Sequence, residues 1–142
     1  MLVGHLALIT SAVFSGAAVY ISVAEQPARL TLDDRALLEQ WKVSYRRGFM
    51  MQASLAILGS VLGIAAYILY HDARWLVGAI LLFANWPFTL IFIMPTNNTL
   101  MAVAPDAVSM ETRRLLQRWG GLHAFRGVLG VMATAMFFWA LN

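Results

Sequence analysis

The chain contains no cysteine among its 142 residues. This absence excludes disulfide bonds, thiolate metal sites, cysteine nucleophiles and the dithiol relays of membrane quinone reductases. The sequence also contains no Walker loop, nucleophile elbow, HExxH motif or dinucleotide-binding fingerprint, which are the patterns that mark nucleotide-binding proteins, hydrolases and zinc proteases. Several large classes of enzyme are therefore excluded by composition and motif alone.

Charged residues are scarce as well. Only 12% of the residues are charged and 61% are hydrophobic, a composition too apolar for a soluble domain of this length. Apolar stretches long enough to cross a bilayer lie at about 2–24, 49–70, 75–94 and 119–141, and the first three contain no Asp, Glu, Lys or Arg. We therefore predict an all-α, four-helix transmembrane bundle that forms one domain over residues 1–142. The start MLVGH has no Lys or Arg, so we expect a retained first span and not a signal peptide.

Basic residues are unevenly distributed between the connections. Five lie between the first and second spans, four lie between the third and fourth spans or within the start of the fourth, and the loop between the second and third spans holds only Arg74. The positive-inside rule predicts a multi-pass cell-membrane protein with cytoplasmic long connections and with both termini outside. This topology explains the pI of about 9.8, so we expect no nucleic-acid partner.

The two long connections themselves have helical patterns. In 32–48 and 106–126 large apolar residues recur at helical spacing, and Thr31 is a plausible N-cap for the first. Helices 2 and 4 are therefore expected to extend on the cytoplasmic side or to lie partly along the membrane interface. RALLEQW (35–41) also resembles RRLLQRW (113–119). A tandem two-helix repeat and coincidence among apolar helices are both open interpretations of this similarity.

Each span carries polar residues on one helical face. Such faces turn away from lipid, so four of them would form a polar cavity with aromatic walls toward the cytoplasmic side. The residues expected to bind a ligand there are Arg29, Trp41, Tyr45, Gln52, Trp86, Asn97 and Trp119. For Ser15, Ser22 and Thr89 we expect hydrogen bonds between helices instead. Pro87 should kink the third span and free the carbonyl of Phe83.

His123 lies at the mouth of the fourth span, in RWGGLHAFRG (118–127). The 15 residues from Gly127 to Leu141 span only about 22 Å as a helix, less than the roughly 30 Å of a hydrocarbon core. His123 and Arg126 are thus drawn to the membrane boundary, where ionisable groups are costly and a functional role is expected. Glu25 is at a similar depth, and it either orients His123 as a general base or forms a salt bridge with Arg29 or Arg126. His5 and His71 fall at the opposite side, and no metal site is expected.

The segments EQPARL (25–30), WKVSYRRGFMMQASLAILG (41–59), WLVGAILLFANWPFTLIFIMPTNNTL (75–100) and RWGGLHAFRGVLG (118–130) together resemble a family of small four-span membrane proteins. This family is often labelled anthrone-oxygenase-like. The patterns WPxT, PTN and WxxxHxxR are distinctive when they occur in this order, and the resemblance covers nearly the whole chain.

The resemblance implies an enzyme that oxidises anthrones to anthraquinones with O2 and needs no metal or flavin cofactor. For that reaction, residue chemistry suggests His123 as the base, Glu25 as its orienting partner or an alternative base, and Arg126 with Asn97 as groups that stabilise an anion. Trp41, Tyr45, Trp86 and Trp119 would wall a slot for an apolar polycyclic substrate. A small-molecule binding or transport protein and a structural membrane subunit remain the alternatives, and a homo-oligomer is compatible with each.

Overall fold

The computed structural model describes residues 1–142 and contains helices only. It has four helical runs, each long and apolar enough to cross a membrane. The first run comprises α1 (Leu2–Tyr20), the π-helical η1 (Ile21–Glu25) and α2 (Gln26–Arg29), and the second is α3 (Asp34–Tyr70). The third comprises α4 (Ala73–Phe83), α5 (Asn85–Phe88), η2 (Thr89–Ile93, also π-helical) and α6 (Met94–Ala102), and the fourth is α7 (Met110–Leu141). The predicted all-α bundle of four helices is confirmed.

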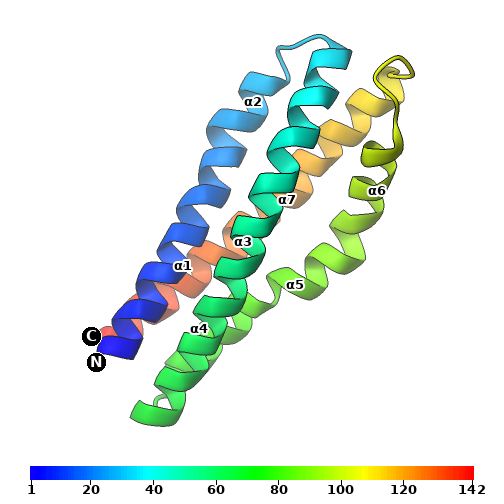
Figure 1. Cartoon of the computed structure of the whole chain (residues 1–142). Coiled ribbons are helices and arrows are strands. Elements are labelled where there is room, and N and C mark those ends of the chain that lie inside the picture. The colour runs from blue at the N-terminus through cyan, green and yellow to red at the C-terminus, as the bar shows by residue number, and fades with distance from the viewer.

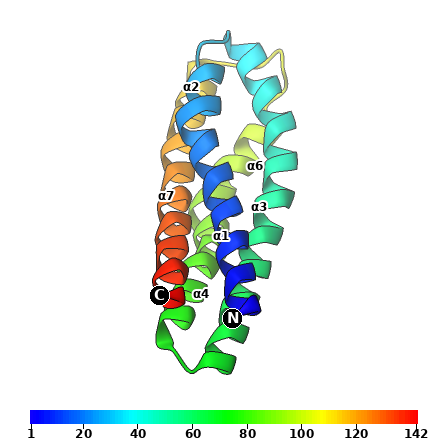
Figure 2. The ribbon, with the colours of Figure 1, turned by 90° about the vertical axis from the view of Figure 1, so that its left-hand side faces the viewer.

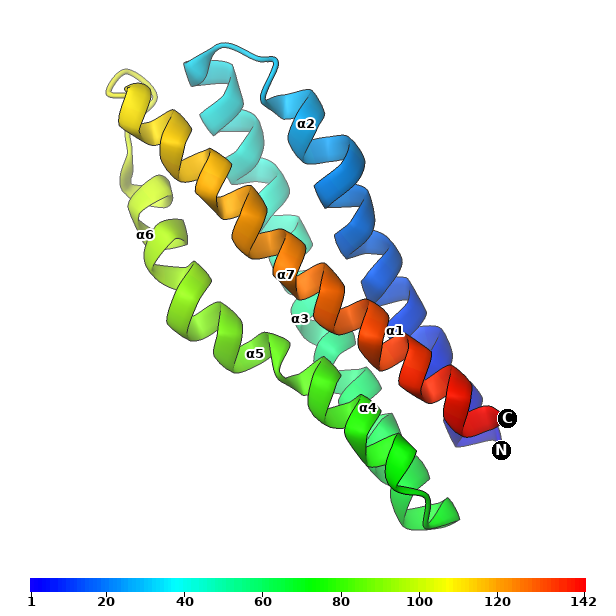
Figure 3. The same ribbon diagram turned by 180° about the vertical axis from the view of Figure 1, so that it is seen from behind.

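The four runs lie side by side and alternate in direction (Figures 1 and 2). Helix α1 packs against α3 and α7, and α4 packs against the same two helices, so the four helices form the corners of a square bundle. Both termini lie at one end (Figures 1 and 3). The turn before α3 and the loop before α7 lie at the other end, which we name the basic end because most of the Lys and Arg residues surround it.

The second and fourth helices are longer than a membrane is thick. α3 has 37 residues and α7 has 32, which correspond to about 56 Å and about 48 Å at 1.5 Å per residue. A hydrocarbon core is only about 30 Å thick. Residues 34–48 and 110–126 therefore continue the second and fourth spans as straight helices at the basic end. They do not form helices that bend along the membrane surface.

The start of α3 differs from the prediction that Thr31 caps it. The N-cap is Asp33, whose side chain accepts hydrogen bonds from the backbone N–H groups of Arg35 and Ala36 at 3.1 Å and 3.0 Å. Thr31 instead donates its hydroxyl to the carbonyl of Ala28, at the end of the preceding helix. The carboxylate of Asp33 reaches the free first-turn amides of α3, so the helix begins two residues later than the sequence pattern suggests.

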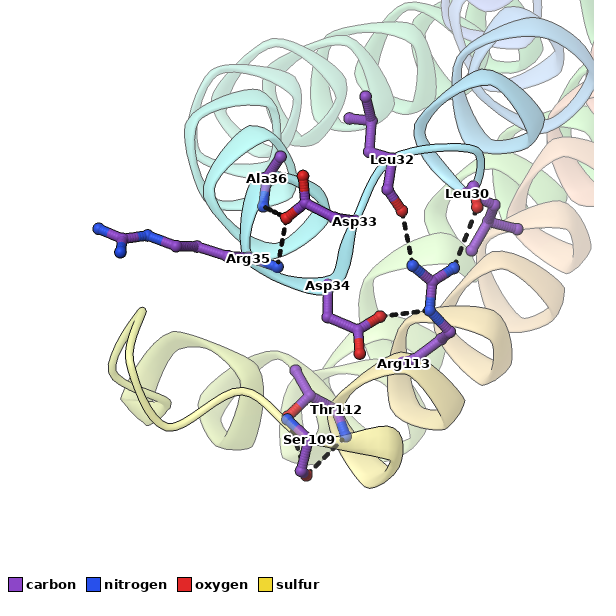
Figure 4. Close-up of polar contacts among 9 residues, drawn as sticks. All are labelled: Leu30, Leu32, Asp33, Asp34, Arg35, Ala36, Ser109, Thr112 and Arg113. Carbon is purple, nitrogen blue, oxygen red and sulfur yellow. Dashed lines mark hydrogen bonds and ion pairs between the residues drawn. The ribbon is translucent and has the colours of Figure 1, made fainter.

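Arg113 fastens the first interhelical turn to α7 at the basic end (Figure 4). Its Nε donates to Asp34 Oδ1 at 2.5 Å, Nη1 donates to the carbonyl of Leu30 at 3.0 Å, and Nη2 donates to the carbonyl of Leu32 at 2.6 Å. The rigid fork of a guanidinium suits such a multiple contact. The turn before α3 is thereby held against the first turns of α7.

The interior contains two apolar cores with a polar layer between them. The terminal core, nearer the chain ends, consists of Ala7, Phe14, Ala56, Ala66, Trp75, Ala79, Leu82, Ala133, Phe137 and Ala140. The basic-end core consists of Leu37, Leu38, Trp41, Ile93, Leu100, Leu116 and Trp119. Between them in sequence, α3 contributes the buried Gln52 and α7 contributes the buried His123 and Arg126. The polar residues predicted for the second and fourth spans thus lie in one layer of the bundle.

The outer faces are apolar. Ile68, Ile80 and Phe138 lie on three different helices and are 61%, 59% and 61% exposed. Water would make such exposure of large apolar side chains unfavourable, whereas lipid tails solvate them. The chain is therefore a multi-pass membrane protein.

Tight helix packing in the terminal core predicts a strong effect of a single methyl group. A Cβ added at Gly78 would lie 2.5 Å and 2.6 Å from Cε1 and Cδ1 of Phe137. We expect Gly78→Ala to destabilise the protein by about 1–3 kcal/mol, because the buried ring has to shift. Gly16→Ala is the matched control, since nothing lies within 4 Å of its added Cβ and alanine is the better helix former. Melting in detergent compares the two, and equal melting temperatures would contradict the prediction.

The orientation predicted from the basic residues can be tested directly because the chain has no cysteine. We expect Asn142→Cys at the C-terminus to react with a membrane-impermeant maleimide added to intact cells. Asp106→Cys, in the loop before α7, should react only after the membrane is permeabilised, because positively charged connections stay in the cytoplasm. The opposite labelling pattern would overturn the predicted topology.

Candidate functional site

The third helical run bends between α4 and α5 (Figure 3), and α5 contains Pro87. Proline lacks the N–H that would bond to the carbonyl four residues earlier, and α4 ends at Phe83 before α5 begins at Asn85. The side-chain Nδ2 of Asn85 donates to the carbonyl of Leu82 at 3.0 Å. Trp86 Nε1 donates to the carbonyl of Ala53 on α3 at 3.3 Å, so the bent segment is fastened to its neighbour.

Two π-helical segments face the same interior space. Ile21 belongs to η1, whereas Thr89 and Ile93 belong to η2, and all three line one cavity. A π-turn carries an extra residue, which rotates the helix that follows it, and such turns are frequent at functional sites. Both irregularities therefore shape the polar layer.

The central cavity, as we name it, lies in that layer. Its α3 wall consists of Ser44, Tyr45, Gly48, Phe49 and Gln52. The other walls consist of Ile21, Thr89, Ile93, Asn97, Trp119, His123 and Arg126. A smaller side cavity shares Phe49, Thr89 and Arg126 with it and extends to Trp86.

The central cavity is lined by polar atoms that have no hydrogen-bond partner in the protein. These atoms belong to Gln52, Thr89, Asn97, Trp119, His123 and Arg126. Buried polar groups in native proteins are nearly always hydrogen-bonded, to protein or to water. Six unpartnered residues on one cavity therefore indicate a site whose donors and acceptors serve a bound molecule or ordered water.

Arg126 is the most unusual member of this group. It is 7% exposed, it forms no ion pair or hydrogen bond, and its guanidinium lies 5.7 Å from the ring centroid of Phe14. A buried charge is costly unless an opposite charge or hydrogen bonds compensate it. The cavity is thus suited to a ligand group that carries negative charge.

His123 is held by stacking alone. Its ring lies against the indole of Trp119 with centroids 4.9 Å apart, and its buried Nδ1 has no hydrogen-bond partner. Trp119 meets Trp41 edge-on at 5.7 Å, and Trp41 stacks on Tyr45 at 4.9 Å. The imidazole is therefore fixed in orientation by an aromatic wall, while a ring nitrogen stays free for chemistry.

Glu25 pairs with Arg29, which is one of the two alternatives open from the sequence. Its carboxylate accepts hydrogen bonds from Arg29, from the hydroxyl of Ser44 and from Gln40, and none from His123. Arg29 also donates to Gln26 Oε1 at 3.2 Å. The guanidinium of Arg29 lies 5.6 Å from the Trp119 ring centroid, so this pair supports the wall behind His123.

The family model for anthrone oxygenase matches residues 41–136, which include all of the cavity lining except Ile21. The chain belongs to the anthrone oxygenase family. Anthrone oxygenase tpcL of Aspergillus fumigatus is 33% identical over 140 residues, covering 92% of this chain and 87% of the relative. An anthrone oxygenase of Claviceps purpurea is 28% identical, with 97% and 88% covered. Anthrone oxygenase nsrD of Aspergillus novofumigatus is also 28% identical, with 95% and 90% covered. No solved structure matches the chain.

The residues predicted to form the site of this anthrone oxygenase family member fall into three groups. Tyr45, Gln52, Asn97, Trp119, His123 and Arg126 line the central cavity together. Trp41 stands behind Tyr45 and Trp119, and Trp86 lines the side cavity. Glu25 and Arg29 lie outside both cavities and before the segment that the family model matches.

Sequence reasoning missed six lining residues, which are Ile21, Ser44, Gly48, Phe49, Thr89 and Ile93. Thr89 was expected to bond between helices, but its buried hydroxyl has no partner. Its spacing from Asn97, eight residues along the same run, was the available signal. Of the other two hydroxyls, Ser15 does bond between helices, to Thr134 at 2.9 Å, whereas Ser22 bonds within its own helix to Ala18.

No group of three or more His, Cys, Asp or Glu side chains that could hold a metal ion is found in this family member. His5 lies near the start of α1 and His71 lies in the turn after α3. The side chains that bring polar groups to the central cavity include His123, Arg126, the amides of Gln52 and Asn97, and the hydroxyls of Tyr45 and Thr89.

Proposed function

We propose that this family member oxidises a polycyclic phenolic substrate of the anthrone type with O2, and that His123 starts the reaction by removing a proton. The observation that carries the proposal is the position of His123 and Arg126, three residues apart on α7, with unpartnered nitrogen atoms on one buried, aromatic-walled cavity. The relatives named anthrone oxygenases support the same class of reaction.

The chemistry requires only a base and anion stabilisation from the protein. An anthrone has an acidic methylene group between two rings. When the free nitrogen of His123 takes one proton, the electron-rich anion can pass an electron to O2 and then combine with the superoxide formed. The resulting carbon hydroperoxide loses its second C–H proton and hydroxide. In total the methylene group and O2 become a carbonyl group and one water molecule, so atoms and electrons balance.

Anion stabilisation is the role we propose for Arg126 and Asn97. Deprotonation places negative charge on the ketone oxygen of the substrate, and a buried guanidinium without an acidic partner is suited to hold that charge. The amide nitrogens of Asn97 and Gln52 are also unpartnered and can donate to the substrate oxygens. Preorganised donors in a water-poor cavity stabilise an anion more strongly than water does.

Flat apolar side chains suit the rings of the substrate. Tyr45, Phe49 and Trp119 line the central cavity, and Trp86 continues the wall into the side cavity. Ligand sites of this kind combine apolar walls with a few fixed polar groups. In this proposal Glu25 is a supporting residue, because it holds Arg29 behind Trp119 and does not face the substrate.

Oxygen uptake tests the proposal. We expect purified protein in detergent to accelerate O2 consumption by 1,8-dihydroxyanthrone well above the uncatalysed autoxidation of the compound, with one water formed per carbonyl. An oxygen electrode and the visible absorption of the anthraquinone product measure the two sides of the reaction. Uptake no faster than autoxidation for this and other hydroxylated anthrones would overturn the proposal and favour a ligand-binding role.

A further inference from the structure

Both ends of the central cavity are closed by apolar packing. The basic-end core lies between the cavity and the basic end, and Leu37, Leu38 and Leu116 in it are 0% exposed. The terminal core closes the other end, where Phe14 and Phe137 are also 0% exposed. A ligand of several rings therefore cannot arrive along the bundle axis, and its route has to pass between two helices.

A large groove runs along the outside of the bundle between the first helical run and α3. This groove, which we name the lateral groove, shares Ile21, Ser44 and Gly48 with the central cavity. Serine and glycine are small, whereas Ile21 is the bulkiest of the three and has a branched side chain. The side cavity also adjoins the central cavity, but it is smaller than the lateral groove, and Trp86 in its lining is fixed by a hydrogen bond to α3.

Gly48 lies at the junction between the lateral groove and the central cavity, because it lines both. A Cβ at this position would meet no atom within 4 Å, so helix packing does not require glycine here. A larger side chain would extend into the open space at the junction.

We propose that the central cavity is entered sideways, through the lateral groove between η1 and α3, by a flat amphipathic ligand dissolved in the membrane. Ala17, Tyr20 and Met51 form the apolar part of the groove, whereas Glu25 and Arg47 lie at its polar part. Tyrosine is typical of the membrane interface. The groove thus crosses the expected membrane boundary. A ligand with apolar rings and phenolic hydroxyl groups concentrates at this boundary. The proposal depends on the proposed function only for the identity of this ligand.

Kinetics of binding, measured without turnover, test the entry route. The probe is 1,8-dihydroxyanthraquinone, and quenching of tryptophan fluorescence in a stopped-flow instrument follows its binding to protein in lipid nanodiscs. Ala17 and Met51 line the lateral groove and not the central cavity. Because the chain has no cysteine, Ala17→Cys with Met51→Cys can be bridged specifically by a cleavable bis-methanethiosulfonate reagent.

Bridging should slow both the association and the dissociation of the probe by about tenfold or more. The equilibrium affinity should stay within about twofold of that of the unbridged protein, because a blocked entrance changes the rates and leaves the binding site intact. Reductant should restore both rates. Unchanged rates after bridging would overturn the route, although the proposed function could still stand. Wild-type protein that does not bind the probe at all would overturn the proposed function and the route together.

A single substitution at the junction gives an independent measure. Gly48→Leu should also slow both rates by about tenfold, whereas Gly121→Leu should leave them unchanged. Gly121 is the matched control because it lies in a helix, has open space around it and lines neither the cavity nor the groove. A Gly48→Leu variant with weaker equilibrium binding and an unchanged association rate would contradict a gate at this position.

Discussion

His123→Phe is expected to abolish catalysed oxygen uptake while the protein remains folded. Phenylalanine keeps a flat ring against Trp119, where the imidazole stacks at 4.9 Å, but it has no nitrogen to accept a proton. Removal of a general base typically costs about 10²–10⁴-fold in rate. The measurement is oxygen uptake with 1,8-dihydroxyanthrone, together with the melting temperature in the same detergent.

Two further variants separate proton transfer from packing. His123→Ala opens space beside Trp119, so added imidazole should restore part of the activity if the ring acts as a base. His5→Ala is the matched control, because His5 is exposed near the start of α1 and far along the helix from the cavity. Activity retained in His123→Phe, or the absence of any imidazole effect in His123→Ala, would assign the base to another group.

The positions of the helices were predictable because lipid imposes a simple rule on sequence. Stretches without charge have to cross the membrane, and three such stretches fall within the observed helices. The extent of α3 was less certain, since Thr31 and Asp33 are both good capping residues. Asp33 is the cap because its carboxylate lies within reach of the first-turn amides of α3. That position depends on how the turn folds.

The α7 side of the candidate site was predictable for a similar reason. His123 and Arg126 are three residues apart, and ionisable side chains on a membrane helix turn toward the bundle interior. The partner of Glu25 was not predictable. Ser22 and Glu25 both lie within the π-helical η1, directly after the regular turns of α1. A π-turn rotates the helix beyond it relative to an unbroken 3.6-residue pattern, and here Glu25 faces Ser44 and Arg29.

Residues without a chemical signature were missed for a different reason. Gly48 and Phe49 carry no polar group, so nothing in the sequence separates them from lipid-facing residues of the same helix. They lie four and three residues before Gln52 on α3 and are its neighbours on that helix, but whether this part of α3 borders a cavity depends on the path of the third run, which bends near α5 (Figure 1). The location of a bend can be read from proline, but its direction depends on packing against α3.

Arg126→Met is expected to remove activity and to make the protein more stable. Its guanidinium is buried and has no acidic partner, so in the free protein the charge is a cost that binding of an anion offsets. An apolar side chain of similar length removes this cost, and we expect the melting temperature to rise by about 5 °C or more. Loss of the charge that stabilises the substrate anion should lower the rate by about 10²–10³-fold.

Arg29→Met is the matched control, and we expect it to lower the melting temperature where Arg126→Met raises it. Arg29 is equally buried, but it is paired with Glu25 and bonded to Gln26 and Ser44. Its removal leaves the Glu25 carboxylate without a counter-ion. Breaking a fully buried pair typically costs about 3–5 kcal/mol, and the 21% exposure of the Glu25 side chain makes a smaller loss the expected result. Thermal melting of the two variants in parallel therefore tests whether the charge of Arg126 is reserved for a ligand. A lower melting temperature for Arg126→Met would show that this arginine serves the fold, and the stabilisation of the substrate anion would then have to come from Asn97 and Gln52.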